Sequence, residues 1–161
     1  MNPDNFTKIV AVNPINPIDS CITPDKDSKS KKNIIKTPIF GTFVYNTIAN
    51  KKSMEGLFKK QYYKDPNRIN KKMIDIYTEN AHLSGSAGKN LFASIVGNYT
   101  SINIIHAMKY ITCPMEFIVT EGYDESALYL QYKPDIKVTT IEDSGYLPQM
   151  EKPGKFIQAL S

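Results

Sequence analysis

Cysteine and histidine are both scarce in this chain of 161 residues. The two cysteines, Cys21 and Cys113, lie far apart and neither belongs to a CxxC pair, so the sequence predicts neither a disulfide framework nor a zinc knuckle. The two histidines, His82 and His106, do not have the spacing of paired metal ligands. We therefore expect no metal site and no cofactor, and we interpret both cysteines as small apolar residues.

Long apolar runs are absent as well. No stretch approaches the roughly 20 apolar residues that a helix needs to cross a bilayer. The first residues, MNPDNFTK, lack the basic region and apolar run of a secretory leader. We therefore expect no membrane span and a cytoplasmic location.

The charge balance is only mildly basic, with 20 Lys and Arg against 16 Asp and Glu, a net charge of +4. Much of the excess lies in DKDSKSKKNIIK, residues 25–36, which contains no aromatic residue for stacking on bases. We therefore predict a solvated basic loop at 25–36. We expect no nucleic-acid partner, because only the charge of this segment would favour one. The apolar share of 41% is that of a globular domain.

The spacing of apolar residues changes twice along the chain. KIVAVNP, residues 8–14, is a β-branched run stopped by Asn and Pro, which predicts a buried strand. Helical spacing follows over 37–100, with predicted starts at Thr37, Ser53 and Asp65. In the first of these helices the apolar side chains share one face, which we expect to be the buried one: Phe40, Phe43, Val44 and Ile48.

After Pro114 the pattern alternates between strand and helix. MEFIVT and KVTTIE predict strands, while DESALYLQY and KPGKFIQAL predict the helices that follow them. We therefore predict a single α/β domain over 1–161, with about three parallel strands and a helical cap over 37–100 inserted after the first strand. Three strands leave an apolar edge along 8–12, which could pair with another copy or a partner chain.

The loops after the last two strands carry the polar residues, in EGYDE and DSGYLPQMEKP. Together with VAVNP and the helical insertion, their order resembles the carboxyl-terminal half of the α/β-hydrolase fold family, whose last strand delivers GHxPxxExP with the triad histidine. The resemblance implies a partial α/β-hydrolase fold. It also implies serine-dependent hydrolysis of carboxylic esters or related acyl substrates, with a small hydrophobic acyl group as substrate.

Carried across to this sequence, the resemblance makes Asp124 the triad acid, with Glu121 and Glu125 as alternatives. Tyr146 occupies the histidine position. A phenol with a pKa near 10 stays protonated at neutral pH and cannot accept the proton of a serine, so Tyr146 can only donate a hydrogen bond.

A nucleophile is the other missing part. The sequence has no GxSxG elbow, and the near miss SGSAG, centred on Ser86, follows a helical pattern instead of the strand that an elbow needs. The overlapping GSAGKN lacks the Ser or Thr that a phosphate-binding loop has after its lysine. We interpret the stretch as a helix end and turn, His82 as a residue of the last helical turn and His106 as a solvent-side residue.

Two functions therefore remain open. The first is a truncated α/β-hydrolase, inactive alone because it lacks the nucleophile elbow and has Tyr146 in the histidine slot. The alternative is a non-catalytic binding or interaction module that keeps the fold.

Overall fold

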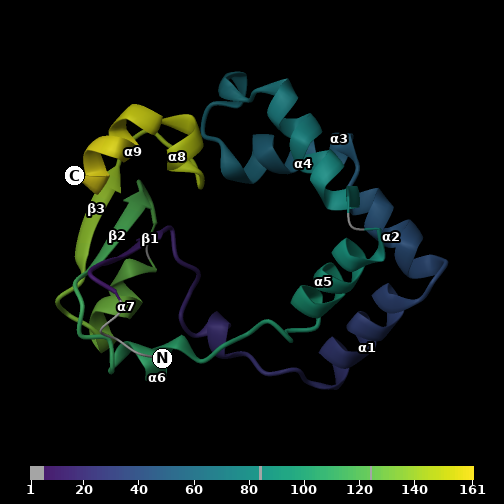
Figure 1. Ribbon diagram of the computed structural model, residues 1–161, viewed down its shortest axis with the longest axis horizontal. Coiled ribbons are helices and arrows are strands. Elements are labelled where there is room, and N and C mark those ends of the chain that lie inside the picture. Colours follow the sequence, from purple (N-terminus) through teal and green to yellow (C-terminus); the bar gives the residue numbers. More distant parts are fainter. Residues whose placement is uncertain (1–5, 84, 124) are drawn as a thin grey trace. The chain divides into compact units, whose positions relative to one another are not determined.

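The computed structural model describes residues 6–83, 85–123 and 125–161. The chain divides into two compact units, and Figure 1 shows their helices and strands. The sheet unit contains the described residues up to Cys21, the short segment Tyr62–Asp65, and Ile102–Ser161. The helical unit contains Ile22–Gln61 and Pro66–Ser101. That this unit acts as a cap stays a prediction.

The sheet unit is built on parallel strands. Strands β1 (Ile9–Val12), β2 (Met115–Thr120) and β3 (Lys137–Ile141) lie in the order β1-β2-β3, and both pairings are parallel. All residues of the central strand β2 are buried, as expected for MEFIVT between two neighbours. The α/β class and the parallel layer that the sequence predicts are confirmed.

Short helices complete the sheet unit. The unit contains α6 (Ile104–Met108), α7 (Ser126–Tyr132), α8 (Pro148–Glu151), α9 (Pro153–Leu160) and the 3-10 turn Asp19–Cys21. In the core, the Tyr129 ring of α7 meets the Phe117 ring of β2 edge to face, with 4.9 Å between the ring centres. The other buried members of this core are Met108, Met115, Val119 and Ile136.

A buried carboxylate lies in the middle strand. Glu116 of β2 forms ion pairs with Lys8 (Nζ–Oε2, 2.6 Å) and Lys137 (Nζ–Oε1, 2.9 Å), and Thr139 Oγ1 donates to Oε1 at 3.0 Å. The hydrogen bonds from Lys8 and then Lys137 lower the pKa of Glu116 from 4.5 to about 2. The charged form of Glu116 therefore favours the folded state.

The lowered pKa of Glu116 predicts how the free energy of unfolding changes in acid. Because the folded-state pKa is lowered, the contribution of Glu116 is complete above pH 4.5 and is lost as the pH falls toward about 2. At pH 7, Glu116→Gln should reduce the free energy of unfolding by about 2 kcal/mol, since both lysines keep access to water. Urea unfolding at pH 7, 4 and 2.5 should show the difference shrinking. A constant difference over this range would contradict the assignment.

The helical unit contains only helices and turns among its described residues. They are α1 (Lys26–Lys36), α2 (Phe40–Ile48), α3 (Lys51–Leu57), the π-helical turn Phe58–Tyr62, whose last residue belongs to the sheet unit, the 3-10 turn Pro66–Arg68, α4 (Lys71–Leu83) and α5 (Ser86–Val96). The helical insertion predicted from the spacing of apolar residues is present, but three details differ.

The first difference is at 25–36, where the prediction of a solvated loop is wrong and helix α1 forms instead. Asp25 caps the helix, since its side chain accepts the Ser28 N–H at 2.7 Å. Ser28 and Ile35 are buried, and α1 packs against α5. The basic composition of this segment concealed a capped helix with one buried edge.

The second difference is where two helices start. Asn50 caps α3 by accepting the Ser53 N–H at 2.9 Å, so Ser53 is not the cap. The helix expected from Asp65 begins instead at Lys71, after a 3-10 turn, and Asn70 accepts a first-turn N–H. An asparagine side chain ends up in the capping role at both places.

The third difference is the face of α2 that is buried. Phe40 and Phe43 are exposed, the latter by 68%, whereas Gly41 and Tyr45 are buried. A side chain at Gly41 would meet the Ile35 carbonyl oxygen at 1.8 Å, so glycine is needed where α1 and α2 approach each other. The predicted apolar face exists, but it points away from the core of this unit.

Candidate functional site at the strand ends

Asn13 follows the last residue of β1 and holds the loop after β3. Its side-chain Nδ2 donates to the Tyr146 carbonyl at 2.8 Å, and its backbone carbonyl accepts the Tyr146 hydroxyl at 3.0 Å. The two residues therefore form a reciprocal pair that joins segments 133 positions apart in the sequence. Asn13 has a φ of 40°, in the left-handed region that asparagine tolerates better than most residues.

The amide oxygen of Asn13 completes the connection between strands. It accepts the Thr120 N–H at 3.0 Å and contacts Thr120 Oγ1 at 3.4 Å, and Thr120 is the last residue of β2. Asn13 is only 2% exposed. One buried side chain thus joins the carboxyl ends of β1 and β2 to the loop after β3, where α/β sheets carry their functional groups.

Three tyrosine hydroxyls hold the residues that follow β1. They donate to three successive backbone carbonyls, and we call this arrangement the tyrosine clamp: Tyr146 to Asn13, Tyr123 to Pro14, and Tyr129 to Ile15 at 2.5 Å. Burial raises the pKa of all three phenols above the usual value of 10.0. The three hydroxyls therefore keep their protons and act as donors at neutral pH.

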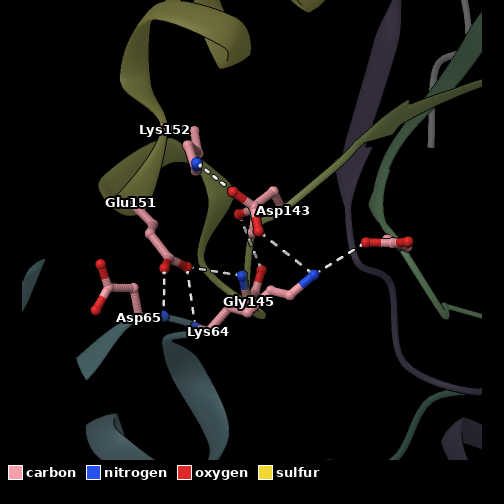
Figure 2. Close-up of polar contacts among 8 residues, drawn as sticks. Lys64, Asp65, Asp143, Gly145, Glu151 and Lys152 are labelled. Atoms are coloured by element: carbon pink, nitrogen blue, oxygen red, sulfur yellow. Dashed lines mark hydrogen bonds and ion pairs between the residues drawn. The ribbon is translucent and has the colours of Figure 1, made fainter. Parts of the chain in front are cut away.

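Lys64 bridges two acidic side chains at the same end of the sheet, and Figure 2 shows its contact with one of them, Asp143. Its Nζ lies 3.0 Å from Glu121, just after β2, and 3.5 Å from Asp143, just after β3. Lys152 pairs with the other oxygen of Asp143 at 3.0 Å. The hydrogen bond from Lys64 lowers the pKa of Glu121, and the one from Lys152 lowers that of Asp143. These carboxylates are charged members of an ion-pair chain.

Glu151 is the buried carboxylate of this region. It is 3% exposed and accepts three backbone N–H groups, from Gly145 at 2.7 Å, Asp65 at 2.8 Å and Lys64 at 3.2 Å (Figure 2). Gly145 lies so close to the backbone of Tyr62 that a side chain at position 145 would meet the Tyr62 carbonyl oxygen at 2.5 Å. Glu151 therefore fixes the segment Tyr62–Asp65 against the loop after β3.

Comparison with known proteins was made by family, by sequence and by structure. No family model and no curated protein matches the chain. Solved structures do match: a putative α/β hydrolase from Nostoc (TM-score 0.66, 17% identity, 98% of this chain and 57% of that one) and an esterase from Thermogutta terrifontis (0.61, 14%, 98% and 55%). The chain has a partial α/β-hydrolase fold.

A third match agrees with the other two. A bromoperoxidase from Bacillus anthracis aligns with a TM-score of 0.61 at 12% identity, over 95% of this chain and 56% of that one. The chain thus spans a little over half the length of these α/β-hydrolases. At such identities the likeness establishes the fold.

The α/β-hydrolase resemblance offers three candidates for the triad acid, and the structure describes two of them. Asp124 lies outside the described residues. Of the two alternatives, Glu121 is 60% exposed and paired with Lys64. Glu125 precedes α7 and makes no side-chain capping bond there. The role of acid stays a prediction for all three.

Tyr146, assigned to the histidine position of the α/β-hydrolase fold, acts as a hydrogen-bond donor. Its hydroxyl is bound to Asn13, and its ring stacks on Tyr62 with 6.0 Å between the centres and 26° between the planes. The side chain keeps 41% of its surface exposed. That it occupies the histidine position stays a prediction.

The histidines and the near-miss serine have other surroundings. His82 lies in the last turn of α4, where a ring nitrogen is 3.2 Å from the Ala49 carbonyl. His106 is exposed in α6 with its ring edge to face with Tyr110. Ser86 is the first residue of α5, after Gly85 with a φ of 54°, and α4 precedes this turn. A nucleophile elbow would need a strand there.

Two absences hold for the part of the chain that the structure describes. Within residues 6–83, 85–123 and 125–161, no group of three or more His, Cys, Asp and Glu side chains could hold a metal ion. None of the helices in these ranges is long and apolar enough to cross a membrane.

Sequence reasoning missed Asn13 and Glu151, two buried residues that hydrogen-bond to several partners at the strand ends. Asn13 appeared only as the residue that stops the first strand, although VAVNP marks the carboxyl end of β1. Glu151 is the glutamate of the ExP ending that carries the resemblance, and that motif was its available signal.

Proposed function

We propose that this chain supplies the carboxyl-terminal part of an α/β-hydrolase acting on carboxylic esters or related acyl substrates, and that it is inactive alone. The observation that supports this most directly is the Tyr146 hydroxyl, which donates to Asn13 at the place where the resemblance puts a base. Burial raises the pKa of Tyr146, so this phenol is an even weaker proton acceptor at neutral pH than a free one.

The substrate class rests on the fold and on the helices. One structural neighbour is an esterase, and the order of strands and insertion is that of the resemblance. Phe40 and Phe43 expose aromatic rings on the helical unit, and such surfaces suit a hydrophobic acyl group. A nucleophile elbow and an oxyanion loop have to come from polypeptide other than these 161 residues.

The cellular setting is part of the same proposal. We assign the protein to the cytoplasm.

In the described sheet β1 pairs with β2, and its other edge can accept a strand from another copy or from a polypeptide that carries the nucleophile.

Hydrolysis of short-chain nitrophenyl esters by the purified chain tests this proposal. We expect no turnover above the buffer rate, and we expect the Ser86→Ala variant to behave identically. Saturable hydrolysis that Ser86→Ala abolishes would overturn the proposal, because it would make Ser86 a nucleophile. Tyr146→His should restore nothing, since these 161 residues contain no GxSxG elbow whose serine a base could activate. Measurable turnover in that variant would equally contradict the proposal.

A further inference from the structure

The helical unit contains a groove lined by residues of α3, of the turns that follow it and of α4. Helices α3 and α4 pack against each other, and Figure 1 shows them in the helical unit. The volume of the groove is about 700 Å³, within the usual range for small-molecule sites. Three lysines and one glutamate line it, and isoleucines form its apolar part: Lys51, Lys59, Lys71, Glu55, Ile69 and Ile74. Nothing in the site at the strand ends uses these residues.

The charges of the groove are unbalanced. Three ammonium groups and one carboxylate leave the lining side chains with an excess of positive charge. Glu55 pairs with Lys59 at 2.6 Å, and the hydrogen bond from Lys59 lowers the pKa of Glu55, followed by the charges of Lys71 and Lys51. Lys51 also pairs with Asp75 of α4. Glu55 and Asp75 therefore balance Lys59 and Lys51, and the charge of Lys71 is the excess at the groove.

The start of α4 adds to this imbalance. The helix begins with Lys71 and Lys72 and has no acidic residue in its first turn. The amino end of a helix carries a partial positive charge, so lysines there are unfavourable unless an anion is near. Among the described residues Lys71 forms no ion pair, which leaves its ammonium group available to a ligand.

The apolar part of the groove limits what kind of anion would fit. Ile74, which is 1% exposed, and Ile69 are among the side chains that line it. Contact with these side chains favours a ligand with a hydrocarbon portion over a bare inorganic ion.

We propose that this groove binds a small organic anion with an apolar tail, of the medium-chain carboxylate class, with Lys71 as the main contact for its charged group. The proposal does not rest on the hydrolase function, because it concerns binding within the helical unit only.

Titration calorimetry with octanoate and the purified chain tests the proposal. We expect saturable binding at one site, weakened about fivefold in Lys71→Gln and in 0.5 M NaCl. Lys72→Gln, at the neighbouring exposed position outside the groove, is the matched control and should bind as the unchanged chain does. Glu55→Gln should tighten binding about threefold, because it removes the competing carboxylate.

Two further probes separate charge from hydrocarbon. Acetate, which lacks the tail, and octan-1-ol, which lacks the charge, should each bind at least tenfold more weakly than octanoate. Equal binding of acetate, equal binding of octan-1-ol, or equal loss in Lys71→Gln and Lys72→Gln would each overturn the proposal, as would no heat of binding at all. Circular dichroism of each variant confirms that the helices are intact, and ester turnover plays no part in any readout.

Discussion

Replacing Asn13 with alanine is expected to lower the free energy of unfolding by about 3 kcal/mol. The change removes the amide that joins Tyr146 and Thr120 and leaves the buried Thr120 N–H and the partly buried Tyr146 carbonyl without their partner. It also puts an alanine at a φ of 40°, which adds about 1 kcal/mol. Urea unfolding monitored by circular dichroism measures the loss.

Glycine at the same position separates these two contributions. Asn13→Gly removes the same side-chain hydrogen bonds but is free of the cost of the left-handed backbone. We expect it to lose roughly 2 kcal/mol, less than the alanine variant. An alanine variant within 0.5 kcal/mol of the unchanged chain, a figure typical of neutral surface changes, would show that Asn13 does not connect the strand ends.

Replacing Glu151 with glutamine is the second substitution for which we expect a large effect. The glutamine side chain offers one acceptor oxygen, whereas the carboxylate accepts the N–H groups of Lys64, Asp65 and Gly145 with two. Hydrogen bonds to a charged acceptor are the stronger kind, so we expect a loss of about 3 kcal/mol. Urea unfolding measures it against the unchanged chain.

A local readout shows whether Glu151 positions the segment Tyr62–Asp65. Hydrogen exchange at the Lys64, Asp65 and Gly145 amides should accelerate in Glu151→Gln more than exchange in β2 does. Glu121→Gln is the control, because Glu121 is exposed, and we expect it to leave exchange at these amides close to that of the unchanged chain. Uniform acceleration across the sheet unit would contradict a local positioning role.

The sheet could be predicted because its signals are local. MEFIVT and KVTTIE are β-branched runs that follow one another with a helix between them, and the structure gives both as parallel neighbours. The segment 25–36 misled because its lysines and serines outweigh two adjacent isoleucines in composition, while the capping by Asp25 and the burial of Ile35 decide its structure.

The strand-end contacts escaped prediction for a physical reason. The bond between Asn13 and Tyr146 joins residues 133 positions apart, and the bonds that Glu151 accepts from Lys64 and Asp65 span 87 and 86 positions. Hydrogen bonds of this kind depend on the finished fold, which a periodicity of two or three and a half residues does not encode. The motif ending in ExP placed Glu151 in the right loop without indicating its partners.

The return of the chain to the sheet unit at Tyr62–Asp65 divides the helices into two excursions. Each one, Ile22–Gln61 and Pro66–Ser101, leaves a fixed point of the sheet unit and comes back to another. The two excursions also pack on each other, through α1 with α5 and α3 with α4. A change of length in either one therefore has to keep those contacts, while Glu151 holds the backbone between them. Insertions on the solvent side of either excursion would leave the register of the parallel strands unchanged.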